Sequence, residues 1–197
     1  MTALAAPAGA SSMISDGRQS PAAASIMRGT QRLMRSLGYS SITELPLVNG
    51  RRADIVSVAP DGGICIVEVK SCVADFRADR KWQDYLDYCD RFYFAVDAAM
   101  PEGIIPEDVG LIVADSYAAA IIRNASVNKA NGSRRRATLL AFAKCAADRL
   151  HNLADPEASA LLRRGYRGAR LASMRCSVRR CMLSRRAVSE TLRPQSS

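Results

Sequence analysis

The residues "GRRADIVSVAPDGGICIVEVKS", numbered 50–71, form two apolar runs that flank a turn of proline, aspartate and glycine. Both runs are rich in the β-branched residues that favour strands. Three charged residues, Asp54, Glu68 and Lys70, interrupt the runs where a strand normally buries apolar side chains. The stretch therefore predicts two antiparallel strands that carry charged groups near one end.

Strand geometry brings these three charges together. Because side chains alternate between faces, Glu68 and Lys70 share one face. If Val58 pairs with Ile64 across the turn, Asp54 lies opposite Glu68, with the two Cβ atoms about 5 Å apart. A divalent cation between the carboxylates would relieve their repulsion, and Mg²⁺ is typically held by one or two carboxylates. The alternative is a polar hairpin end in which Lys70 neutralises both acids.

Patterns on both sides of this stretch predict the rest of an α/β domain. Ser25 is the expected cap of the first helix. The expected helices are 25–37, 78–90 and 133–153, and the expected strands are 41–48, 51–59, 64–70, 91–96, 109–115 and 118–123. The connection before the strand at 91–96 is long enough for a parallel crossover, so we predict a sandwich with a mixed sheet flanked by helices.

Composition indicates one globular domain with two tails. The chain has 197 residues, of which 48% are hydrophobic. We expect a disordered segment at 1–22, the domain at 23–155 and an arginine-rich tail at 156–197. The sequence shows neither a long apolar run nor a secretory signal, which predicts a soluble cytoplasmic protein without a membrane partner. Its six cysteines form no CxxC pair and only one histidine is present, so a zinc site is not expected.

The net charge of +9 is concentrated in the predicted tail. Residues 156–197 contain ten arginines and two glutamates, a net charge of +8, which leaves +1 for the remainder of the chain. Such a tail can hold a polyanion such as DNA through non-specific phosphate contacts. A solvated, disordered extension without a partner is the alternative.

The motif of Asp54 followed by Glu68-Val69-Lys70 resembles the PD-(D/E)XK nuclease superfamily. The wider stretches "GRRADIVSV", "IVEVKSCVADFRADRKWQDYLDYCDRFYFAVD" and "EDVGLIVAD" resemble the MmcB family of bacterial DNA repair proteins over about residues 26–155. The resemblance implies a restriction-endonuclease-like three-layer sandwich, an endonuclease activity and a role in DNA repair. It covers neither tail.

The resemblance also implies roles for individual residues. Asp54, Glu68 and the carbonyl of Val69 would hold Mg²⁺ or Mn²⁺ for phosphodiester hydrolysis, and Lys70 would steady the attacking water or the charge that builds on the phosphate. The rival hypothesis is a non-catalytic module that keeps the fold in order to bind DNA or a repair partner.

Many of these nucleases add a glutamate from the first helix, but that helix has no acidic residue here. Glu44 is the nearest substitute. A two-residue hairpin turn would place Leu45 opposite Asp54 and turn Glu44 to the other face, unless Pro46 marks a bulge that resets the register. Whether Glu44 reaches the metal is therefore left open by the sequence.

Several basic and aromatic residues lie near the motif in sequence. The basic ones can grip phosphates or simply be solvated, and they are Arg51, Arg52, Arg77, Arg80 and Lys81. Trp82 and Tyr85 can stack on bases, but their helical spacing favours packing in the core.

Overall fold

The structure, a computed structural model, describes residues 20–79 and 81–157. Six strands form one sheet in the order β1-β2-β3-β4-β5-β6. The strands are β1 (Ser40–Pro46), β2 (Arg52–Val58), β3 (Ile64–Lys70), β4 (Arg91–Val96), β5 (Gly110–Ala114) and β6 (Ala119–Arg123). Strands β1 to β3 are antiparallel neighbours, β3 to β5 run parallel, and β6 is antiparallel to β5. The mixed sheet confirms the predicted α/β fold class.

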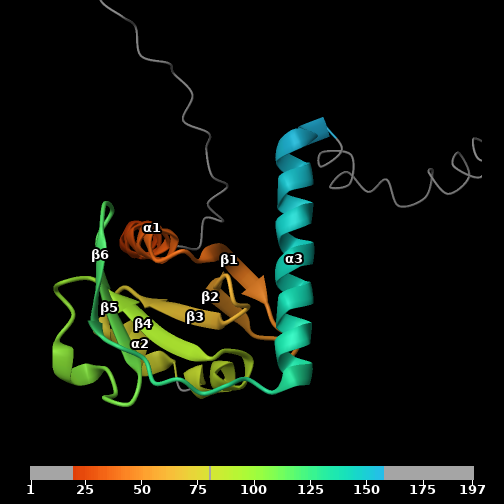
Figure 1. The fold of residues 1–197 in the computed structure, drawn as a ribbon. Coiled ribbons are helices and arrows are strands. Elements are labelled where there is room, and N and C mark those ends of the chain that lie inside the picture. Colours follow the sequence, from red (N-terminus) through yellow and green to blue (C-terminus); the bar gives the residue numbers. More distant parts are fainter. Residues whose placement is uncertain (1–19, 80, 158–197) are drawn as a thin grey trace, which may run out of the picture. The chain divides into compact units, whose positions relative to one another are not determined.

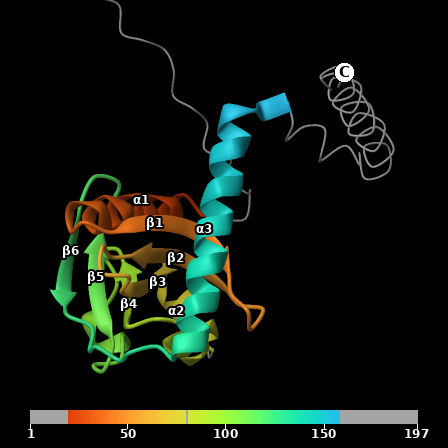
Figure 2. The ribbon, with the colours of Figure 1, turned by 45° about the vertical axis from the view of Figure 1, so that its right-hand side comes forward.

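Helices cover both faces of this sheet (Figure 1). Helix α1 (Pro21–Ser36) packs on one face, where Ile26 and Met34 join a core with Ile55 and Val67. The connection between β3 and β4 covers the other face with α2 (Val73–Ala78) and the 3₁₀ helix η1 (Trp82–Tyr88). Figure 2 shows α1 and α2 on opposite sides of the strands in a second view.

Helix α1 begins earlier than the sequence predicts. Its cap is Ser20, whose hydroxyl accepts a hydrogen bond from the Ala23 N–H at 3.1 Å, and Pro21 occupies the first helical position. Proline is common at that position because a backbone N–H there has no partner within the helix, so the lack of an N–H in proline costs no hydrogen bond. The predicted cap, Ser25, instead lies inside the helix and shares a 2.6 Å hydrogen bond with the Ser116 hydroxyl.

The crossover from β3 to β4 differs from the single helix predicted at 78–90. It consists of α2 followed by η1, and a 3₁₀ helix has three residues per turn. Trp82, Tyr85 and Tyr88 therefore recur on one side and are buried, whereas Leu86, which α-helical spacing places in the core, is 37% exposed. Trp82 stacks on Phe92 with ring centroids 5.5 Å apart, which confirms a packing role for this tryptophan.

The β1–β2 hairpin also differs from the hairpin that the sequence predicts. The Leu47 N–H donates to the Arg51 carbonyl at 2.7 Å, so the loop holds three residues and not two. Gly50, the last of the three, has φ +79°, a conformation that glycine adopts without strain. Thr43 pairs with Ile55 and Leu45 pairs with Ala53. The remaining position opposite Asp54 therefore belongs to Glu44.

Two further helices complete the described part of the chain, the short 3₁₀ helix η2 (Glu102–Ile104) and α3 (Gly132–Ala154). The compact unit that contains the sheet ends at Ala146. Within this unit, Leu139 and Phe142 of α3 pack against the core on the η1 side. No helix within 20–79 and 81–157 is long and apolar enough to span a membrane. The predicted segment at 1–22 and tail at 156–197 lie almost entirely outside the described residues.

Candidate active site between β2 and β3

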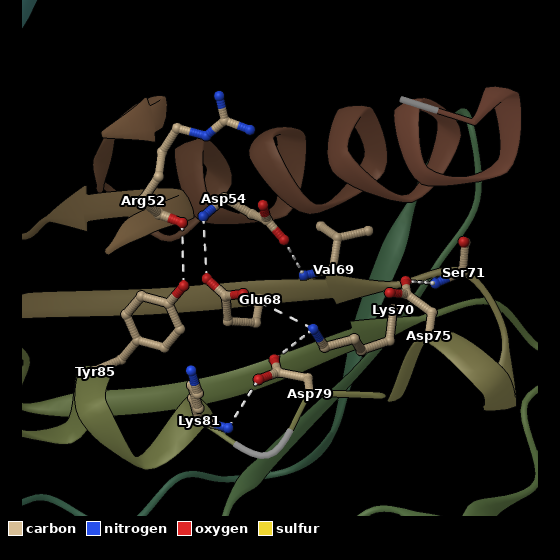
Figure 3. Close-up of polar contacts among 10 residues, drawn as sticks. All are labelled: Arg52, Asp54, Glu68, Val69, Lys70, Ser71, Asp75, Asp79, Lys81 and Tyr85. Carbon is tan, nitrogen blue, oxygen red and sulfur yellow. Dashed lines mark hydrogen bonds and ion pairs between the residues drawn. The ribbon is translucent and has the colours of Figure 1, made fainter. Parts of the chain in front are cut away.

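Strands β2 and β3 pair from Val58 and Ile64 to Ile55 and Val67, which confirms the register predicted for this hairpin. Beyond these pairs, side chains supply the hydrogen bonds between the two strands. The Asp54 N–H donates to Glu68 Oε1 at 3.1 Å, and the Val69 N–H donates to Asp54 Oδ2 at 2.9 Å (Figure 3). The two carboxylates thus lie between the strands at the position that the sequence predicts.

Lys70 completes the predicted group of three, and it is deeply buried. Glu68 is 4% exposed and Lys70 is 6% exposed, whereas Asp54 is partly buried. The Lys70 Nζ atom lies 2.6 Å from Asp79 Oδ2 and 4.0 Å from Glu68 Oε2. Two carboxylates and an ammonium therefore meet in a site that is largely closed to solvent.

This setting changes the ionisation of all three groups. Burial, with help from the Asp54 charge, raises the pKa of Glu68 to about 9. Burial also raises the pKa of Asp54 to about 6, although the Val69 N–H and Lys70 oppose the rise. Burial on its own would lower the pKa of Lys70, but its hydrogen bond to Asp79 and the nearby carboxylate charges together outweigh that effect, and the pKa is raised. At neutral pH, without a cation, Glu68 is therefore protonated and Lys70 is charged.

We expect Glu68→Gln to stabilise the metal-free protein at pH 8. A raised folded-state pKa means that the contribution of Glu68 to stability is fully present below about pH 4.5 and is lost as the pH rises toward 9. Glutamine has no proton to lose and keeps the acceptor for the Asp54 N–H. The free energy of unfolding should increase by about 2 kcal/mol, and the melting temperature by about 5 °C, at pH 8.

Thermal unfolding in the presence of a chelator measures this difference. At about pH 4 wild type and variant should melt at nearly the same temperature, because wild-type Glu68 is then protonated in both the folded and the unfolded state. A variant that is less stable than wild type at both pH values would contradict the raised pKa.

The donor set suits a hard cation. Each carboxylate gives one oxygen to a backbone N–H, which leaves the second oxygen of Asp54 and of Glu68 for another partner. The Val69 N–H points toward β2, and the carbonyl of a strand residue points to the same side as its N–H. Among residues 20–79 and 81–157, no group of three or more His, Cys, Asp or Glu is arranged to hold a metal. An ion here would thus rely on two carboxylates, the carbonyl, and water or substrate oxygens, which is a usual set for Mg²⁺.

Glu44 lies near this group but has a different partner. It has φ +54°, a left-handed conformation that is uncommon for a residue other than glycine. Its Oε2 atom lies 2.5 Å from Arg52 Nε, and its charge contributes to raising the pKa of Asp54. The three-residue loop, and not a bulge at Pro46, thus brings Glu44 to the site, where it is the partner of an arginine.

The predicted phosphate-binding residues fall into two groups. Arg51 pairs with Asp84 at 2.8 Å and Arg52 pairs with Glu44, so both are engaged with acidic residues. Arg77 and Lys81 are exposed, and the Lys81 N–H contacts Asp79 beside the site. Arg80 lies outside the described residues.

Sequence reasoning missed two residues that contact the site from the β3–β4 crossover. Asp79 binds Lys70, and the Tyr85 hydroxyl donates to the Arg52 carbonyl at 3.1 Å. Figure 3 shows both residues approaching β3 from the side opposite α1. Tyr85 was predicted as a core residue, but nothing in the spacing of Asp79 indicated a contact with Lys70.

One family model and two solved structures match the chain. A family model described as "DNA repair protein MmcB-like" matches residues 10–157. A solved structure titled SPO1766 protein of unknown function from Silicibacter pomeroyi is 41% identical with a TM-score of 0.67, covering 69% of this chain and 93% of that chain. A repair endonuclease from Pyrococcus abyssi matches at 21% identity and a TM-score of 0.31, over 46% of this chain and 42% of that chain. No curated protein sequence matches the chain.

Proposed function

We propose, from the premise that this chain belongs to the MmcB-like family of DNA repair proteins, that it hydrolyses DNA phosphodiester bonds with Mg²⁺ or Mn²⁺ held at Asp54 and Glu68. One observation carries the proposal. Two carboxylates and a lysine are gathered between neighbouring strands, where burial raises the pKa of both acids, so ionising them together costs free energy unless a cation offsets it. The resemblance to PD-(D/E)XK nucleases falls on these same residues.

The acidic residues and Lys70 would have different roles in the reaction. Asp54 and Glu68, with the Val69 carbonyl, would hold the ion. When bound, the ion polarises the scissile phosphate and lowers the pKa of a bound water. Lys70 places a compact positive charge beside the reacting group, where it stabilises the negative charge that develops on the phosphate oxygens. Burial strengthens that stabilisation because little water screens the charge.

DNA would approach from the β3–β4 crossover. Arg77 and Lys81 are exposed residues of that crossover and are candidates for phosphate contacts. Arg80 and the arginine-rich segment at 156–197 are further candidates from their sequence alone. We propose a cytoplasmic location, which would give the protein access to the chromosome.

The second candidate function is a non-catalytic module that binds DNA or a repair partner. The ion pair between Arg52 and Glu44 favours it, since a glutamate that is neutralised by an arginine is a poor third ligand for a metal. The module needs the fold and its surface but no ion.

Calorimetric titration with Mn²⁺ separates the two functions. The wild-type protein should bind one ion, and Asp54→Asn should weaken binding by at least about tenfold because it removes a charged ligand. Asp108→Asn is the matched control, since Asp108 is an exposed acid that no contact links to the site. At pH 7.5 binding should release protons, because Glu68 must lose its own to ligate.

Cleavage of intact, nicked, branched and single-stranded DNA is then measured with Mn²⁺ and with a chelator. Metal binding together with chelator-sensitive cutting supports the nuclease. Metal binding without cutting of any substrate favours the module, and failure to bind Mn²⁺ even with DNA present rules out the metal site.

A further inference from the structure

The Lys70 ammonium lies between the carboxylates of Glu68 and Asp79, and it is much closer to Asp79. Its Nζ atom is within hydrogen-bonding distance of Asp79 Oδ2, at 2.6 Å, while the gap to Glu68 Oε2 is 4.0 Å. Glu68 and Lys70 are both on β3 and side by side on one face, so the flexible lysine stem could close that gap. The observed position of the ammonium is therefore set by Asp79.

Asp79 is itself held in place. It follows α2, its N–H donates to the Phe76 carbonyl at 3.1 Å, and its Oδ1 atom accepts the Lys81 N–H at 3.1 Å. One carboxylate oxygen is thus fixed by the backbone while the other receives the ammonium of Lys70 (Figure 3). The side chain is 20% exposed, so the hydrogen bond to Lys70 is only weakly screened by water.

The other acid near Lys70 cannot replace Asp79 in this task. Asp75 lies on α2, and its Oδ2 atom accepts the Ser71 N–H at 3.4 Å, at the start of the helix. Its charge reaches Lys70, but no hydrogen bond to the ammonium is formed in the described part of the chain. Without Asp79, the described acid that remains within 4.0 Å of the Lys70 ammonium is Glu68, through its Oε2 atom.

We propose that Asp79 is a positioning residue that keeps Lys70 off Glu68, so that one oxygen of Glu68 stays available to a divalent cation. The inference rests on the proposed function, because it assigns a purpose to an open carboxylate oxygen. If Lys70 closed onto Glu68, the ammonium would occupy the place of the cation and neutralise its ligand. Asp79 therefore governs cation affinity without touching the cation.

Mn²⁺ titration of Asp79→Asn tests this role. The affinity for Mn²⁺ should fall about tenfold, which is the usual effect of removing a residue that orients the metal ligands without binding the metal. Asp79→Glu, which restores the negative charge, should recover most of that loss. The control is Asp87→Asn. Asp87 lies on the same crossover as Asp79 and forms an exposed ion pair with Arg134 of α3, so its loss should leave the Mn²⁺ affinity unchanged.

A double-mutant cycle shows whether Asp79 acts through the lysine. In a Lys70→Met background, Asp79→Asn should cause no further loss of Mn²⁺ affinity, because no ammonium remains to be held. An equal loss in both backgrounds would mean that Asp79 binds the ion directly or supports the fold, and either result overturns the proposal.

A crystal structure of metal-free Asp79→Asn gives a readout that is independent of metal binding and of cleavage. The distance from Lys70 Nζ to Glu68 Oε2 should shrink from 4.0 Å to about 2.9 Å, the length of an N–H···O hydrogen bond. A distance that stays near 4.0 Å overturns the proposal. If wild-type protein binds no Mn²⁺, the proposed function fails, and this distance alone still decides what Asp79 does.

Discussion

Lys70→Met is expected to lower the rate of metal-dependent DNA cleavage by about a hundredfold or more, the usual effect of removing one group that stabilises transition-state charge. Methionine keeps most of the aliphatic volume of lysine, so the buried site is not emptied. The loss should appear in kcat, because Lys70 is 6% exposed and has little surface with which to bind DNA. Single-turnover cleavage at saturating Mn²⁺ measures the chemical step directly.

Two controls accompany this variant. Lys129→Met removes an exposed lysine near Ile64, at the end of β3 opposite Lys70, and this variant should cleave DNA at the wild-type rate. Mn²⁺ affinity of Lys70→Met should be equal to or higher than that of wild type, since an ammonium 4.0 Å from Glu68 repels the cation. Equal cutting by wild type and Lys70→Met would point to a contaminating nuclease and would remove Lys70 from the mechanism.

Gly29→Ala is expected to lower the free energy of unfolding by about 3 kcal/mol, at the upper end for an overpacked site. A Cβ atom at this position of α1 would lie 2.2 Å from the carbonyl oxygen of Asp115 and 2.5 Å from that of Ala118. Both contacts are with backbone atoms at the turn between β5 and β6, so no side chain can rotate away. Helix α1 would have to move off the sheet.

Urea denaturation followed by circular dichroism measures the change. Gly132→Ala is the matched control, because Gly132 is also helical but a Cβ atom there meets nothing within 4 Å. That variant should be as stable as wild type or more stable by up to about 1 kcal/mol. Equal stability of the two variants would show that α1 is less tightly docked at Gly29 than its contacts indicate.

The sequence predicted the sheet well because strands and turns are local features. The β2–β3 register was predicted from one turn and from the alternation of side chains between the two faces of a strand. It correctly placed Asp54 opposite Glu68. The β1–β2 register was wrong by one residue, because Asn49-Gly50 fits both a two-residue and a three-residue loop. That single residue decides whether Glu44 faces the site.

The crossover was less predictable for a different reason. Apolar residues from Trp82 to Cys89 fit both an α-helix and a 3₁₀ helix, and only packing against β4 selects the tighter form. The contact between Asp79 and Lys70 depends on where that crossover places the chain. No spacing rule relates two residues separated by a strand end and a short helix, so this part of the site required the structure.

The hydrogen bonds that Asp54 and Glu68 make across the strands have a consequence for genetic experiments. Each carboxylate also serves as part of the sheet, since it accepts a backbone N–H from the neighbouring strand. An alanine at either position leaves that N–H without its acceptor, and the cell would then degrade part of the protein. A repair defect in such a strain would combine low abundance with lost chemistry. Asparagine or glutamine keeps an acceptor in place, so strains carrying those residues report on the chemistry alone.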